Sequence, residues 1–103
     1  MYTKIMNEVN QKIGIHLREL RKISGLSQYE VAHKCHVKQS HISKTELGEH
    51  ALLFSEIFTY APALGLKPDD LFDSICRLLN EYAKSKAQID CQPNQNARDH
   101  ASL

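Results

Sequence analysis

The sequence predicts an all-α fold, and three observations support that prediction. Apolar residues recur every three or four positions from Val9 to Leu20, as they do on one face of a helix. The tetrapeptide SQYE at 27–30 has the S-x-x-E pattern of a capping box, which marks the start of a helix. Pro68 is followed by two aspartates and a long apolar run, which is typical of the first turn of another helix.

Size and composition indicate one compact domain. The chain has 103 residues, of which 42% are hydrophobic, and this is enough for one modest core. No stretch approaches about eighteen consecutive apolar residues, and the first residues lack the apolar region of a signal peptide, so we expect a cytoplasmic protein. The three cysteines, Cys35, Cys76 and Cys91, are widely spaced and odd in number, which favours reduced thiols over a disulfide framework.

Charge is distributed unevenly along the chain. The net charge is only +1, but residues 1–50 contain eight Lys/Arg against five Asp/Glu, whereas residues 51–103 contain five against seven. A positively charged surface attracts phosphate groups. The first half of the chain is therefore the better candidate for contacting a nucleic acid.

The first helix is expected over residues 8–24. Its apolar face consists of residues spaced four, four and three positions apart: Val9, Ile13, Leu17 and Leu20. Gly25 follows at a position where a left-handed residue commonly ends a helix.

The second helix is expected to begin at Ser27. The Ser27 hydroxyl and the Glu30 carboxylate can satisfy backbone donors there, and Leu26 and Val31 stand at the two positions of a hydrophobic staple. A tight turn should lead into a third helix at about 39–47. Helices of two to three turns are marginally stable alone, so both must pack against the first helix.

Two further helices are expected downstream. The fourth is indicated by apolar residues at helical spacing, namely Ile57, Phe58, Ala61 and Leu64. Pro62 lies inside it and removes a backbone hydrogen bond, so this helix should be kinked or short. The fifth begins at Pro68 and has an apolar face wider than one stripe, formed by Leu71, Phe72, Ile75, Cys76, Leu78, Leu79, Tyr82 and Ala83. Residues 88–103 have no helical period and are expected to form a flexible tail.

Segment 17–48, LRELRKISGLSQYEVAHKCHVKQSHISKTELG, closely resembles the helix-turn-helix of the Cro and phage-repressor-like (XRE) transcription regulators. The residues that agree in order and spacing are Leu26-Ser27-Gln28, Ala32, Val37, Ile42, Ser43-Lys44, Glu46 and Gly48. The likeness continues more loosely through LGLKPDDLF at 64–72. It implies a repressor-like five-helix DNA-binding domain at 8–66, an extended C-terminal helix at 67–87, which is a possible dimerisation element, and the tail at 88–103.

In such a motif one short helix crosses the DNA backbone and braces a second helix that enters the major groove. The small Ala32 would let these two helices approach closely, and Val37 and Ile42 would be buried toward the first helix. The opposite face of the third helix then carries hydrogen-bonding side chains suited to base edges.

The resemblance assigns a role to each of these positions. Base contacts fall to Gln39, Ser40, Ser43 and Lys44. Phosphate contacts fall to Gln28, Lys38 and His41. Gln28 stands at the start of the second helix, where free backbone donors also favour a phosphate. Arg21 and Glu46 occupy positions at which the family often forms a structural ion pair.

Two positions near the third helix depart from the family pattern. Lys38 stands where a capping Ser or Thr is commoner, which weakens the cap but adds a cation near the phosphates. Thr45 replaces a large apolar residue, which should loosen the packing unless its hydroxyl bonds to the preceding turn.

The expected function is sequence-specific binding of double-stranded DNA to control transcription, as a repressor-like homodimer on a near-palindromic operator. The dimer surface is expected around Ile75, Leu79 and Tyr82, and the alternative for this apolar face is the protein's own core. Two other functions remain open: an antitoxin that binds both DNA and a toxin, and a protein-interaction module that has lost DNA binding. The corresponding alternative for residues 27–48 is a helical hairpin used only for packing.

Four residues that could bind a metal lie close together in the sequence: His33, Cys35, His36 and His41. Zinc needs converging ligands, whereas Cys35 falls on the apolar side of its helix and His33 and His36 point elsewhere. A nucleophilic Cys–His pair would lack a third orienting group. We therefore expect no metal site, no cofactor and no enzymatic activity.

Overall fold

The computed structural model describes residues 3–90, and within them it contains five α-helices, one short 3-10 helix and no strand. The elements are α1 (Lys4–Ile23), α2 (Gln28–Cys35), α3 (Gln39–Leu47), η1 (Phe54–Glu56), α4 (Ile57–Ala63) and α5 (Pro68–Asp90). The all-α prediction is confirmed. No helix in this part of the chain is both long and apolar enough to cross a membrane.

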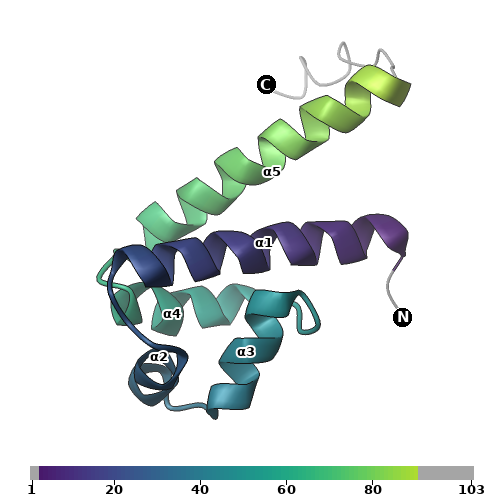
Figure 1. Ribbon diagram of the computed structural model, residues 1–103. Coiled ribbons are helices and arrows are strands. Elements are labelled where there is room, and N and C mark those ends of the chain that lie inside the picture. The colour runs from purple at the N-terminus through teal and green to yellow at the C-terminus, as the bar shows by residue number, and fades with distance from the viewer. Residues whose placement is uncertain (1–2, 91–103) are drawn as a thin grey trace.

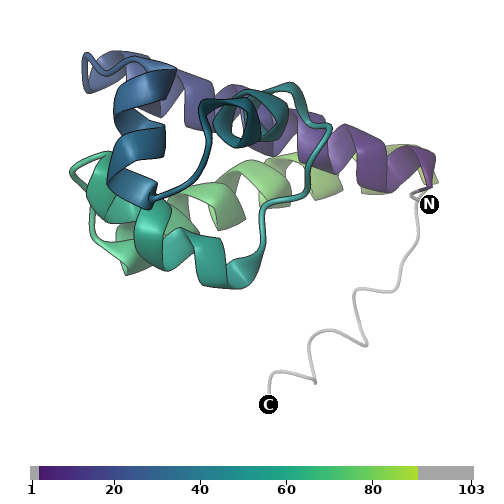
Figure 2. The ribbon, with the colours of Figure 1, turned by 90° about the horizontal axis from the view of Figure 1, so that it is seen from below.

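Helix α1 runs through the middle of the molecule, with α5 on one side and α2, α3 and α4 on the other (Figure 1). The view from below shows α2, α3 and α4 together on that second side (Figure 2). The core lies between these layers and takes buried side chains from all five α-helices: Leu17, Val31, Ala32, Cys35, Ile42, Ile57, Tyr60, Ala61, Ala63, Leu64, Leu71 and Ile75.

Helix α1 begins at Lys4, four residues earlier than the apolar pattern predicts. Thr3 caps it, since its hydroxyl accepts a hydrogen bond from the Met6 N–H at 3.1 Å. The added first turn continues the apolar spacing through Ile5, four residues before Val9, but Ile5 and the neighbouring Met6 are both exposed. At the other end Gly25 has a φ of 76°, as the prediction of a left-handed residue requires.

The capping box predicted at the start of α2 is present. The Ser27 hydroxyl accepts from the Glu30 N–H at 3.1 Å, and the Glu30 carboxylate accepts from the Ser27 N–H at 2.7 Å. Helix α2 ends at Cys35, and its C-cap residue His36 has a φ of 60°, the one positive value at a non-glycine residue in the described part of the chain. Histidine tolerates this left-handed conformation better than β-branched residues do.

Helix α3 is held at its inner face by a buried Ile42 and a buried Thr45. The Thr45 hydroxyl donates to the His41 carbonyl at 2.9 Å, so this buried hydroxyl group has the hydrogen-bond partner that it needs in place of an apolar side chain. Lys38 makes no side-chain cap. The prediction that Val37 is buried is wrong: its side chain is 37% exposed, because it lies in the α2–α3 turn ahead of the helix.

Helices α4 and α5 lie on opposite sides of α1, and both contribute side chains to the core (Figure 1). Helix α4 contains Pro62 and has only seven residues, as expected for a helix that includes a proline. Helix α5 begins at Pro68 and continues to Asp90, three residues beyond its predicted end at 87. Residues 91–103 of the predicted tail lie outside the described residues.

The three residues expected at a dimer surface all contact their own chain. Ile75 belongs to the core, and Leu79 packs against it. Tyr82 donates a hydrogen bond to Glu8 of α1, and the Lys12 ammonium lies 5.1 Å from the centre of its ring. This part of the wide apolar face is therefore occupied within the chain.

Candidate nucleic-acid interface

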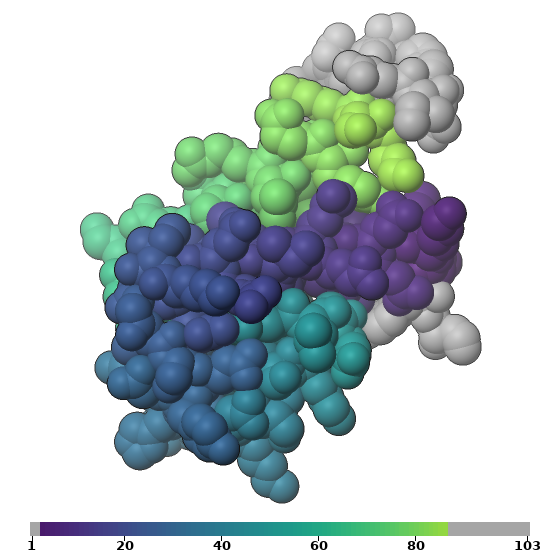
Figure 3. Space-filling view, viewed as in Figure 1, coloured from purple at the N-terminus to yellow at the C-terminus, as the bar shows by residue number. Residues whose placement is uncertain are grey.

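Helices α2 and α3, coloured blue and teal in Figure 3, form the end of the molecule opposite α5. The inner side of α3 is buried through Ile42, Thr45 and Glu46. Its opposite side, which we call the outer face of α3, carries the four predicted base-contacting residues Gln39, Ser40, Ser43 and Lys44. Ser40 and Lys44 are exposed, whereas Gln39 and Ser43 are half-buried.

Helix α3 lies unusually close to α1 at Gly14. A Cβ atom at this position would lie 2.4 Å from the Glu46 carbonyl oxygen and 2.6 Å from that of Thr45. Only a residue without a side chain permits this approach. Gly14 therefore determines how closely α3 packs against α1. A glycine at a buried position of an amphipathic helix is the feature of the sequence that indicates such a close approach.

A buried ion pair fixes the same region. Arg21 Nε donates to Glu46 Oε2 at 2.6 Å and Arg21 Nη2 to Glu46 Oε1 at 3.0 Å, while Nη1 donates to the Leu26 carbonyl at 2.9 Å. The hydrogen bond with Glu46 raises the pKa of Arg21, so the guanidinium stays charged. The pair that the resemblance implied thus joins α1, α3 and the turn before α2.

The ion pair continues into two glutamines. Gln28 Nε2 donates to Glu46 Oε1 at 2.9 Å, and Gln39 Nε2 donates to Gln28 Oε1 at 2.6 Å. A chain of hydrogen bonds therefore leads from buried Arg21 to Gln39 on the outer face of α3. All four residues are candidates from the sequence, but the contact between the two glutamines depends on how α2 and α3 cross, which the sequence does not show.

Two hollows flank the outer face of α3. One, of about 480 Å³, is lined by Gln11, Ile15, Arg18, Gln28, Ser43, Glu46 and Leu47. The other, of about 390 Å³, is lined by Val37, Lys38, Ser40, His41, Lys44 and His50. Arg18 and Leu47 are exposed beside predicted DNA-contacting residues but are not among the residues predicted from the sequence. The sequence does indicate that Leu47 lies on this side of α3, because it follows Ser43 and Lys44 by one helical turn.

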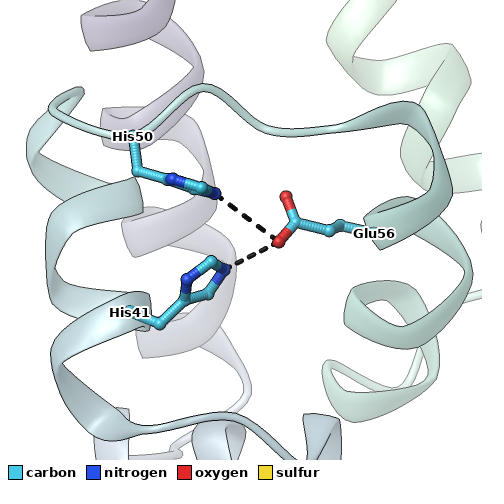
Figure 4. Close-up of side chains that lie close together, drawn as sticks. All are labelled: His41, His50 and Glu56. Atoms are coloured by element: carbon cyan, nitrogen blue, oxygen red, sulfur yellow. Dashed lines mark hydrogen bonds and ion pairs between the residues drawn. The ribbon is translucent and has the colours of Figure 1, made fainter.

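His41 turns away from the outer face of α3. Its Nε2 atom lies 2.7 Å from Glu56 Oε2 of η1, and its ring packs edge-on against His50 with the ring centres 4.2 Å apart (Figure 4). Of the residues expected to contact phosphates, Lys38 is exposed and Gln28 is half-buried, whereas His41 is engaged with η1.

Comparison with known proteins identifies the fold. A family model described as "Helix-turn-helix" matches residues 17–71, which is more than half of the chain. The chain belongs to this family. It is a helix-turn-helix protein of the Cro and phage-repressor type, a group of DNA-binding transcription regulators rather than enzymes. No curated protein sequence matches the chain.

Solved structures agree with this assignment. The restriction-modification controller protein C.AhdI from Aeromonas hydrophila is 34% identical, with a TM-score of 0.55 over 59% of this chain and 92% of that one. The clp gene regulator ClgR from Corynebacterium glutamicum is 20% identical, with a TM-score of 0.62 over 78% of this chain and 86% of that one, and this likeness shows the fold alone.

Proposed function

We propose that this helix-turn-helix protein binds a specific double-stranded DNA sequence and regulates transcription, with α3 in the major groove. The observation that supports this most directly is the hydrogen-bond chain from Arg21 through Glu46 and Gln28 to Gln39. It anchors a flexible side chain of the outer face of α3 to a buried charge. A side chain that is ordered before binding loses less conformational entropy when it contacts a base.

Gln39 suits the recognition of adenine. It donates one N–H to Gln28, so its second N–H and its oxygen can address adenine N7 and N6. Lys44 and Ser40 are exposed beside it. Lys44 can donate to guanine O6 and N7, and the Ser40 hydroxyl can bond to several kinds of base edge. Ser43, half-buried next to Gln28, is the fourth base-contacting residue that we propose.

Phosphates flank the groove, and cations near its edges supply most of the non-specific attraction. Exposed Lys38 precedes α3, and exposed Arg18 lines the hollow on the other side. Gln28 is the first residue of α2, where backbone N–H groups lack partners within the helix and favour an anion. We therefore propose phosphate contacts by Lys38 and Gln28, and we add Arg18 to them.

Selection from a random duplex DNA library, at near-physiological salt, tests the proposal. We expect enrichment of an inverted repeat, because a homodimer places two recognition helices one helical turn apart on one side of the DNA. Absence of any enriched sequence would contradict sequence-specific binding and would favour the protein-interaction module.

Variants then test the outer face of α3 on the selected site. Gln39→Ala and Lys44→Ala are each expected to weaken binding by about 1 to 3 kcal/mol and to relax the preference at one base pair. Lys67→Ala removes an exposed cation from the α4–α5 loop and serves as the matched control, with little change expected. Equal affinities for all three variants and the unmodified protein would refute the assignment of these residues.

A further inference from the structure

Three side chains from separate parts of the chain meet beside α3. His41 comes from α3, His50 from the segment between α3 and η1, and Glu56 from η1 (Figure 4). Glu56 Oε2 lies 2.7 Å from His41 Nε2 and 3.7 Å from His50 Nε2, and the three potential ligand atoms all lie within 4.8 Å of one another. All three residues are half-buried.

We propose that His41, His50 and Glu56 form a binding site for a divalent transition-metal ion of the zinc type. Two imidazole nitrogens and one carboxylate oxygen are ligands that zinc uses in proteins, together with a water molecule in the fourth position. At metal–ligand bonds of about 2.0 to 2.1 Å, tetrahedral geometry separates the ligand atoms by about 3.3 Å. The observed separations bracket that value, so small side-chain rotations can bring all three atoms to the ion.

The surroundings of His50 indicate that its Nε2 atom has a binding partner that is not part of this chain. Its Nε2 atom is shielded from solvent and has no hydrogen-bond partner among the described residues. A buried polar atom without a partner costs free energy, and native proteins rarely leave one unpaired. A simple His41–Glu56 hydrogen bond explains the position of those two residues, but it does not explain why His50 directs an unpaired nitrogen at the same carboxylate.

A hydrogen bond to its second carboxylate oxygen orients the side chain of Glu56. Glu56 Oε1 accepts a hydrogen bond from the Leu53 N–H at 2.8 Å, which leaves Oε2 directed toward the two histidines. Hydrogen bonds of this kind hold metal-binding carboxylates in place. The carboxylate is therefore fixed in the direction that metal binding requires.

An ion can reach the site from the hollow of about 390 Å³ beside α3, which both histidines line. The same hollow has room for a water molecule as fourth ligand. Lys38 and Lys44 also line it, but both side chains are exposed, so water and salt screen their repulsion of a cation. Once bound, the ion would tie α3 directly to η1.

This set differs from the one considered from the sequence, with which it shares only His41. His33, Cys35 and His36 take no part in it. His50 and Glu56 lie nine and fifteen residues beyond His41, a spacing with no motif, so only the fold brings them together.

Isothermal titration of the tag-free, full-length protein with Zn²⁺ alone tests the proposal. We expect saturable binding of one ion per chain, its loss in His50→Gln, and at least about tenfold weaker binding in Glu56→Gln. The matched control is His33→Gln, which removes an exposed histidine on α2 and should bind as the unmodified protein does. Absence of saturable binding, or unchanged binding by His50→Gln, would overturn the proposal.

Thermal unfolding separates loss of the site from loss of the fold. Zn²⁺ is expected to raise the Tm of the unmodified protein and of His33→Gln, because a ligand of the native state stabilises it, and to leave that of His50→Gln unchanged. Should His50→Gln be unfolded without metal, Glu56→Gln decides the question, because its amide oxygen can still accept from Leu53. An equal rise of Tm in the unmodified protein and in a folded Glu56→Gln would refute the site. Because neither measurement involves DNA, the metal site and the DNA-binding proposal can fail separately.

Discussion

The guanidinium group of Arg21 is buried, and its charge is balanced by the carboxylate of Glu46. The side chains of Arg21 and Glu46 are only 11% and 2% exposed, and every Arg21 hydrogen bond described above stays within the protein. A buried pair contributes little net stability compared with apolar residues, but removal of one partner leaves the other charge unpaired in a poorly hydrated place.

We therefore expect Arg21→Ala to lower the free energy of unfolding by about 3 to 5 kcal/mol, measured by urea denaturation. Arg77→Ala is the control, because Arg77 pairs with Asp73 one turn away on the surface and should contribute less than about 1 kcal/mol. Similar losses for the two variants would contradict the role assigned to the Arg21–Glu46 pair.

His16 should make stability depend on pH. Burial lowers the pKa of His16, against the opposing effect of the Glu19 carboxylate, and its Nε2 lies 2.9 Å from Ser74 Oγ. The folded protein therefore binds this proton less readily than the unfolded chain does. The contribution of His16 to the free energy of unfolding is complete above the unfolded pKa of about 6.5 and decreases as the pH falls below it.

Urea denaturation at about pH 7.5 and about pH 5.5 measures this effect. His16→Gln keeps a hydrogen-bonding group near Ser74 but does not titrate, so its loss of stability between the two pH values should be smaller. Equal losses in the variant and the unmodified protein would assign the pH dependence to other groups.

Between elements, the contact of α1 with α3 depends on the missing side chain of Gly14. We expect Gly14→Ala to lower the free energy of unfolding by at least about 3 kcal/mol, because the new methyl group meets backbone atoms that cannot rotate away. Ala would otherwise be favoured here, since it is the better helix former by about 1 kcal/mol.

Gly25→Ala gives the comparison for this substitution. Gly25 has a φ of 76° and open space around it, so only the cost of about 1 to 2 kcal/mol for a left-handed residue applies. Chemical denaturation of both variants separates the two effects. A smaller loss for Gly14→Ala than for Gly25→Ala would show that α3 can move away from α1 at little cost.

At the scale of the whole molecule, an aromatic cluster remains exposed. Phe54 of η1, Phe58 of α4 and Phe72 of α5 are 66%, 57% and 44% exposed, and their rings pack edge-on with centres 5.7 to 5.9 Å apart. Aromatic residues are enriched in the buried centres of protein interfaces. Ile75 is buried in the core, whereas Leu79 and Tyr82 are half-buried. We therefore propose this more exposed cluster as a surface of the homodimer, and the surface around Leu79 and Tyr82 remains the alternative.

Sedimentation of the purified protein tests this placement. Phe58→Ser is expected to weaken self-association by about tenfold or more, as loss of a central aromatic contact does. Ile23→Ser is the control, because Ile23 is an exposed apolar residue at the end of α1 that does not belong to the cluster. A monomer at all concentrations, or unchanged association of Phe58→Ser, would exclude the cluster as a dimer surface.

The local features of the fold follow from the sequence alone, because their causes lie within a few residues of one another. The Ser27–Glu30 capping box, the left-handed Gly25 and the proline start of α5 each depend on neighbours in the chain, and the structure contains all three. The extra turn of α1 shows the limit of this reasoning, since the Thr3 cap precedes a turn whose apolar residues, Ile5 and Met6, are exposed.

Which of these local elements contact one another depends on how the helices pack in three dimensions. Ile75, Leu79 and Tyr82 have the composition of an interface, but Ile75 and Leu79 also contact the core and Tyr82 contacts α1, because α5 packs beside α1. Gln28 meets Gln39, and His41 meets His50 and Glu56, through the crossing of α2 with α3 and the return of the chain through η1. Periodicity assigns a residue to a face of its own helix, whereas the partner of that face depends on packing between helices, which no short stretch of sequence encodes.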